Sequence, residues 1–199
     1  MPDNLIPGAI LCLPFAAAAA TWLMRERGHN RAAWLMTGAA LLGLALSLWL
    51  APAIFAGEVL RQTIPWAPSL GLDLVLRVDG FSWLMLLLIC GIGALVGVYA
   101  RYYMSPDDPL ARFFALLLAF MGSMLGIVMS GNVIQLVFFW ELTSLFSFLL
   151  IGYWHHGASA RDGARMALIV TSGGGFCLLA GMLLLGHIAG SYELDAILA

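Results

Sequence analysis

Long apolar runs separated by short polar connections dominate the sequence. An α-helix needs about 20 predominantly apolar residues to cross the hydrocarbon core of a bilayer. Six runs meet this requirement, at Leu5–Met24, Ala32–Leu50, Phe81–Tyr103, Phe113–Met129, Val133–Trp154 and Ala164–Ile188. The pattern therefore predicts an all-α fold, a polytopic transmembrane helix bundle with six spans.

The connection between the second and third runs is longer and is patterned differently. Near its end, apolar residues stand at positions 72, 74, 76 and 78, and charged residues stand at positions 73, 77 and 79. A period of two is typical of a half-buried β-strand. We expect a short β-hairpin-like loop on the membrane surface that caps the bundle. We expect Asp79-Gly80 to end the strand and begin the third helix.

Glycines inside the runs predict where helices approach closely. Gly93 and Gly97, and likewise Gly122 and Gly126, have the four-residue spacing typical of tight helix contacts in membranes. The sixth run also contains the unusual triplet at 173–175. We interpret this triplet as a tightly packed position, with a flexible hinge as the alternative.

Composition agrees with a protein whose solvent is lipid. The chain of 199 residues is 62% hydrophobic and only 10% charged, whereas soluble domains carry about 25% charged residues. The net charge of −2 gives no reason to expect nucleic acid as a partner. The three cysteines are far apart in apolar runs, so neither a metal site nor a cofactor is predicted.

The basic residues predict the orientation of the chain. All nine are arginines, so the chain contains no lysine. Only Arg61 and Arg77 lie in the connection between the second and third runs, and the others lie on the first, third and fifth connections. Positive charge accumulates on the cytoplasmic side of membrane proteins. The amino terminus and the β-hairpin-like loop are therefore expected outside the cytoplasm.

One acidic residue stands apart from the others. Ten of the eleven acidic residues lie in connections or at chain ends, but Glu141 is the ninth residue of the fifth run. A charged side chain near the bilayer centre costs on the order of 3 kcal/mol, and such residues usually mark proton or ion pathways. Glu141 is therefore the candidate proton carrier. A structural hydrogen-bonding role is the alternative.

Small polar side chains near Glu141 can extend a proton path from it. A path toward the cytoplasmic end would use Ser144, Thr143, Ser147, Thr171, Ser172 and His155. Hydroxyl groups can hold a chain of water molecules, but they also bond to their own helix without any function. A histidine titrates near neutral pH, although one in a loop can simply be solvated.

Several segments resemble the antiporter-like subunits of respiratory complex I. The amino-terminal region of that family is similar to Val78–Leu84 and Tyr99–Met104, and the start of its proton-antiporter core is similar to Phe139–Ser144 and Ser147–Trp154. The resemblance extends over Asp79–Gly186 and is strongest to the A subunit of the Mrp-type multisubunit Na⁺/H⁺ antiporters. It divides the chain into amino-terminal helices (1–60), a complex I chain 5-like region (61–130) and the start of the antiporter core (131–199).

Two segments favour the Mrp-type antiporters over the L-type subunit of complex I. The L-type subunit typically has Trp-Glu-Gly-Val where this chain has Trp140-Glu141-Leu142-Thr143. It also has Thr-Arg-Val-Gly-Asp in the sixth helix, where this chain has glycine at position 175 in place of the acid. A proton-pumping complex I subunit and a non-transporting membrane scaffold are the alternative functions.

The resemblance implies a function and partners. Glu141 would be the essential glutamate of the fifth helix, in a subunit of an antiporter that exchanges protons for Na⁺ or K⁺. The subunit would lie in the bacterial inner membrane, within a complex of several different subunits. The family pairs this glutamate with a lysine of the seventh helix. Since this chain has no lysine, we expect an amino-terminal part of a longer protein that does not transport ions alone.

Overall fold

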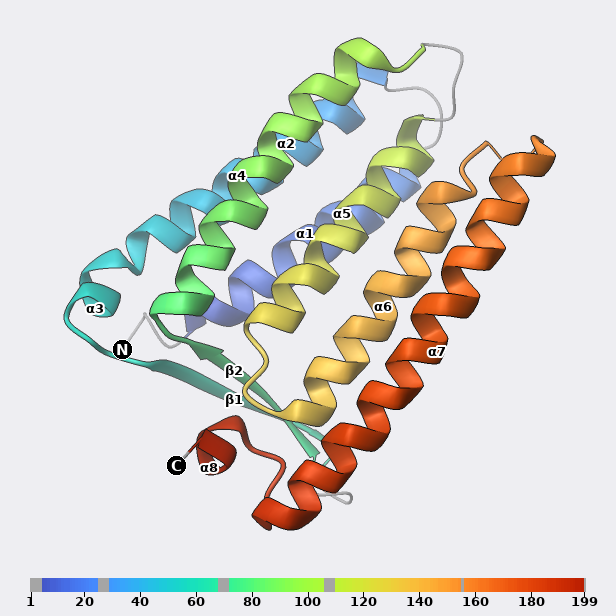
Figure 1. Ribbon diagram of the computed structural model, residues 1–199. Coiled ribbons are helices and arrows are strands. Elements are labelled where there is room, and N and C mark those ends of the chain that lie inside the picture. Colours follow the sequence, from blue (N-terminus) through green and yellow to red (C-terminus); the bar gives the residue numbers. More distant parts are fainter. Residues whose placement is uncertain (1–4, 25–28, 68–71, 106–109, 155, 199) are drawn as a thin grey trace.

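The computed structural model describes residues 5–24, 29–67, 72–105, 110–154 and 156–198. Each predicted apolar run forms one long helix (Figure 1), and all six helices are long and apolar enough to cross a membrane. These helices are α1 (Ile6–Leu23), α2 (His29–Trp49), α4 (Gly80–Tyr103), α5 (Leu110–Val128), α6 (Val133–Ile151) and α7 (Ala158–Ala189). The predicted bundle of six spans is therefore confirmed.

Some helix ends differ from the ends of the apolar runs. Helix α7 begins at Ala158 rather than Ala164, because Arg161 and Asp162 are polar but still compatible with a helix. After α2 the chain bends into the short α3 (Ala51–Phe55), whose first turn contains Pro52. Proline lacks a backbone N–H and so begins helices rather than continuing them. Hydropathy locates the spans, whereas local backbone chemistry decides where each helix starts.

The helices pack as neighbours across the bundle. Helix α2 packs against α4, α1 against α5, α5 against α6, and α6 against α7. Figure 1 shows α7 at one edge, with α6 on its inner side. Only Ala164, Gly175 and Gly186 of α7 are buried. Helix α7 therefore contacts the described bundle through one narrow face.

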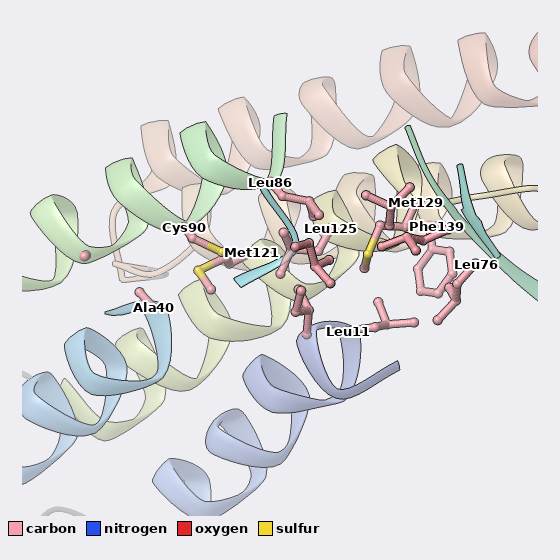
Figure 2. Close-up of a cluster of buried hydrophobic side chains, with 14 residues drawn as sticks. Leu11, Ala40, Leu76, Leu86, Cys90, Met121, Leu125, Met129 and Phe139 are labelled. Carbon is pink, nitrogen blue, oxygen red and sulfur yellow. The ribbon is translucent and has the colours of Figure 1, made fainter. Parts of the chain in front are cut away.

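The buried apolar side chains form two clusters, one of which extends from the helices to the hairpin. Figure 2 shows Leu86, Met121, Leu125 and Phe139 packed into this cluster. The predicted close approach at Gly126 is confirmed, because a β-carbon there would lie 2.3 Å from the Phe139 ring. Shape complementarity of this kind fixes α5 against α6.

The hairpin predicted from the period of two is present. Strands β1 (Leu60–Ala67) and β2 (Leu72–Val78) pair antiparallel. Leu76 and Val78 are buried while Asp73 is exposed, as the alternation predicts. Val75 lies on the same face as Asp73 and is nevertheless buried, because Gly131 packs against it. The first strand lacks such a clear alternation, so the sequence predicts it only as part of a hairpin-like loop.

Asp79 links β2 to α4 in the way the sequence predicts. Its Oδ1 accepts a hydrogen bond of 2.8 Å from the backbone N–H of Ser82, which caps the helix. Its other carboxylate oxygen pairs with Arg77. Burial alone would raise the pKa of Asp79, but these hydrogen bonds and the Arg77 charge outweigh it, so its pKa lies below the usual value.

Two further segments extend the hairpin into a larger unit, here called the ledge: β1, β2, residues 130–132 and residues 192–194. The N–H of Gly131 donates to the Val75 carbonyl (2.8 Å), and the N–H of Leu194 donates to the Gly131 carbonyl (2.8 Å). The N–H of Val133 donates to the Tyr192 carbonyl (3.0 Å). The three residues before α6 therefore pair on both sides, with β2 and with the segment after α7.

Charged side chains strengthen the ledge. Arg61 and Arg77 lie opposite each other on the paired strands, which alone would be unfavourable. Asp195 of the short helix α8 (Leu194–Leu198) bridges both arginines, at 3.2 Å and 2.7 Å, and Glu193 also pairs with Arg61. The segment after α7 is therefore held to the hairpin.

Candidate functional site

The site lies on α6, and two polar side chains hold the amino-terminal end of this helix in place. Asn132 caps the helix, since its Oδ1 accepts from the N–H of Ile134 (2.9 Å). Gln135 fixes the first turn to the hairpin, because its Oε1 accepts from the N–H of Val75 (2.8 Å). Glu141 lies six residues after Gln135, about 9 Å further along the helix axis at 1.5 Å per residue. It therefore lies near the middle of a span of 19 residues.

The carboxylate of Glu141 points toward α7. Its Oε1 atom is buried and has no hydrogen-bond partner among the described residues. A β-carbon built on Gly175 would lie only 1.5 Å from that oxygen. The carboxylate therefore occupies the space that a side chain at position 175 would fill.

The face of α7 that meets α6 consists of small residues. Its three buried positions, Ala164, Gly175 and Gly186, are spaced by 11 residues. Eleven residues are close to three turns of an α-helix, so these positions share one face. Ala164 lies against Gly152, and Gly186 lies under the ring of Tyr192. Gly175 is the member of this face that meets a polar group.

A cleft of about 550 Å³ lies beside this contact, mainly between α6 and α7. Four of the predicted path residues line it together with apolar neighbours: Phe120, Leu136, Trp140, Thr143, Ser144, Ser147, Val170, Thr171, Gly174 and Leu178. Glu141 is not in the wall of the cleft, but its neighbours in sequence are. The cleft thus provides polar groups next to the buried carboxylate.

Three of the four hydroxyl groups in the cleft donate to carbonyls of their own helices. Thr143 donates to the Trp140 carbonyl (2.7 Å), Ser144 to the same carbonyl (3.3 Å), and Thr171 to the Ala167 carbonyl (2.8 Å). This is the bonding that also occurs without any function. Each oxygen nevertheless keeps lone pairs that can accept a bond from water. The geometry is therefore compatible with both alternatives from the sequence.

One predicted path residue does not join this group, and another is outside the part of the chain that the structure describes. Ser172 is half-buried and does not line the cleft. His155 lies outside the described residues. The sequence did not predict the role of Gly175, because the glycine triplet indicates close packing but does not single out one of its three members. Within the described ranges, no group of three or more histidine, cysteine or acidic residues could hold a metal ion.

Two protein-family models match the chain. Residues 65–114 match the model described as NADH-ubiquinone oxidoreductase (complex I), chain 5 N-terminus. Residues 130–199 match the model described as NADH:quinone oxidoreductase/Mrp antiporter, TM, which includes both Glu141 and Gly175.

Curated relatives include components of cation antiporters. The chain is 52% identical over 189 residues to the probable K⁺/H⁺ antiporter A/B subunit of Rhizobium meliloti, covering 95% of this chain and 19% of the relative. It is 47% identical over 143 residues to the Na⁺/H⁺ antiporter A subunit of Alkalihalophilus pseudofirmus, covering 71% of this chain and 18% of the relative. The chain thus spans about a fifth of the length of these relatives.

Solved structures have the same fold. The Mrp complex from Dietzia sp. DQ12-45-1b matches with a TM-score of 0.82 and 29% identity, over 97% of this chain and 21% of that one. The membrane-bound sulfane sulfur reductase, an archaeal respiratory complex, also gives 0.82 at 18% identity, over 96% of this chain and 39% of that one, and shows the fold alone. The chain is a multi-pass membrane protein that belongs to the family of antiporter-like subunits found in Mrp-type antiporters, with their A subunits among its relatives, and in complex I.

Proposed function

We propose that this chain is part of a subunit of a monovalent cation/proton antiporter, in which Glu141 takes up and releases the transported proton. The observation that carries the proposal is the buried Oε1 of Glu141, in the middle of a membrane span and without a hydrogen-bond partner among the described residues. Relatives named as Na⁺/H⁺ and K⁺/H⁺ antiporter subunits support proton exchange against Na⁺ or K⁺.

Electrostatics explains how such a group can be switched. At an effective dielectric constant of about 20, a unit charge about 4 Å away changes the energy of a carboxylate by roughly 4 kcal/mol. A cation that approaches Glu141 therefore favours its anion, and withdrawal of the cation favours proton uptake. The family resemblance implies that a lysine on a later helix of the complete protein is this cation.

The cleft supplies the route in this proposal. Water held by the hydroxyls of Thr143, Ser144, Ser147 and Thr171 would connect Glu141 to one membrane face. His155 and Ser172 would extend this route if the complete protein brings them to it. The complete subunit would work within a hetero-oligomeric complex in the bacterial inner membrane, with its amino terminus outside.

Replacement of Glu141 by glutamine in the complete antiporter complex tests the proposal. Glutamine keeps the shape of the side chain but cannot carry a proton, so cation-dependent proton movement in everted vesicles should fall to the background of vesicles without the complex. Glu141→Asp should keep part of the activity. Glu58→Gln, at an exposed position outside the six spans, is the matched control and should behave as the unmodified complex does.

The opposite result would favour the scaffold alternative. A Glu141→Gln complex that assembles and keeps its full exchange rate would mean that Glu141 only holds helices together. Assembly is measured by copurification of the other subunits, so loss of the complex is not mistaken for loss of proton transfer.

A redox-driven proton pump is the second candidate, because the descriptions of both matching family models name an NADH:quinone or NADH-ubiquinone oxidoreductase. Purification of the native complex distinguishes the two functions. Bound flavin and iron–sulfur clusters would favour the pump, whereas exchange activity without redox centres would favour the antiporter.

A further inference from the structure

We propose that Gly175 is a positioning residue for Glu141, and this inference rests on the function proposed for that glutamate. Because position 175 lacks a side chain, the carboxylate can lie against the backbone of α7. The inference assigns a specific requirement to one member of the glycine triplet: the residue must be small enough to leave the carboxylate its place.

The geometry separates Gly175 from its neighbours. A β-carbon at position 175 would lie 1.5 Å from Oε1 and 2.8 Å from Cδ of Glu141. Both distances are too short for atoms that are not bonded to each other. At Gly173 and Gly174, a β-carbon would meet nothing within 4 Å. The three glycines lie side by side in α7, but only Gly175 is in contact with Glu141.

The carboxylate cannot avoid an added methyl group without changing its surroundings. Ser144, on the same side of α6, is buried, and the adjoining cleft is lined by Thr143 and Thr171. A displaced carboxylate must move toward this cleft or toward lipid, where a charge is costly. In either place, the balance between its two protonation states changes.

Few other titratable groups lie on the elements packed around Glu141. In the described parts of α5, α6 and α7 they are Arg112, Arg161, Asp162, Arg165, Cys177 and His187. Apart from Cys177, which is exposed, all of them lie within the first eight or the last three residues of their helices. The glycine contact with the carboxylate can therefore be altered without removing any of these charges.

The test compares Gly175→Ala with Gly173→Ala in the complete antiporter complex. Both changes replace glycine by alanine inside the same helix, so their effects on helix propensity are matched. A displacement of about 1 Å at a reacting group can cost up to about 100-fold in rate. We expect Gly175→Ala to lower the exchange rate about 10- to 100-fold. We also expect it to move the pH of half-maximal exchange by about half a unit or more. Gly173→Ala should change neither.

A compensating substitution shows whether the steric contact is the cause. Aspartate is one methylene shorter than glutamate, so Glu141→Asp combined with Gly175→Ala removes the overlap. The double variant should exchange faster than Gly175→Ala alone and regain a pH profile close to that of Glu141→Asp. If Gly175→Ala prevents assembly, the same double variant should restore copurification of the subunits.

The outcomes distinguish the inference from the proposed function. An exchange rate and pH profile of Gly175→Ala equal to those of Gly173→Ala would overturn the positioning role, even if Glu141→Gln abolishes exchange. A defect that Glu141→Asp does not relieve, in rate or in assembly, would overturn it as well. Retained exchange in Glu141→Gln would instead overturn the proposed function of the glutamate itself.

Discussion

The contact between Gly126 and Phe139 shows how single residues hold α5 and α6 together. The ring of Phe139 occupies the space beside Gly126 that any side chain would need. Replacing Gly126 by alanine should destabilise the complex by about 1–3 kcal/mol, because an overpacked interface must shift its backbone or its rotamers. Thermal unfolding of the purified complex in detergent measures this loss.

A matched substitution controls for the change in helix propensity. At Gly91 of α4, an added β-carbon would meet nothing within 4 Å. Gly91→Ala should therefore leave the stability within about 1 kcal/mol of that of the unmodified complex. Equal unfolding temperatures for the two variants would show that the ring of Phe139 moves aside freely.

For single residues, the sequence identifies a candidate functional side chain better than it identifies the residues in contact with it. Glu141 could be identified because a carboxylate in an apolar run is costly wherever it points. The partner position Gly175 could not be identified, because the pairing depends on how α7 is rotated and shifted against α6. The hydroxyl groups beside Glu141 were predicted in part: four line the cleft, and Ser172 does not.

Asp79 makes the start of α4 sensitive to pH. Its carboxylate caps the helix and pairs with Arg77, and Asp79→Ala should cost about 1 kcal/mol of stability at neutral pH. Because the pKa of Asp79 is lowered in the folded protein, its contribution is present above the ordinary value of 3.8 and is lost as the pH falls through the lower, folded pKa.

Unfolding curves of the purified complex test this sign. The difference in stability between the unmodified complex and Asp79→Ala should shrink as the pH is lowered from about 7 to about 3. Asp73→Ala, on the exposed side of β2, should leave stability unchanged at each pH. A difference for Asp79→Ala that grows toward acid would contradict the assignment.

The sequence predicts helices and strands well where a local pattern of apolar and polar residues marks them. It does not predict pairings between segments that are distant in sequence. The six helices follow from hydropathy, and β2 follows from its period of two. The pairing of residues 130–132 with β2 on one side and with residues 192–194 on the other joins segments about 60 positions apart in sequence. No local pattern records such a pairing, so the ledge emerges only from the fold.

The hairpin and the start of α7 lie at opposite ends of the bundle (Figure 1), so the side of the membrane that each end faces can be measured. The arginine distribution predicts that the hairpin faces outward, and the orientation itself stays a prediction. In a variant of the complete protein without native cysteines, Thr63→Cys on β1 should react with a membrane-impermeant maleimide added to intact cells. Ser159→Cys, at the opposite end of the bundle, should react only after the membrane is permeabilised. Both positions are exposed.

The reverse labelling pattern would mean that the arginines do not determine the orientation. Labelling of both positions in intact cells would mean that the cells leak or that the chain has two orientations. The comparison uses one protein and two single cysteines, so differences in expression affect both positions alike.

The ledge has a mechanical consequence for the candidate site. Backbone hydrogen bonds join the segment before α6 to the segment after α7, so these two helices share a fixed point at one end. Gly175 lies about 20 Å from the ledge end of α7 at 1.5 Å per residue. A tilt of α7 of only about 3° around that point would change its separation from α6 at Gly175 by about 1 Å, enough to make or break a hydrogen bond to the carboxylate. Because displacement grows with distance from the fixed point, a small rotation at the ledge moves α7 enough at Gly175 to change the surroundings of Glu141.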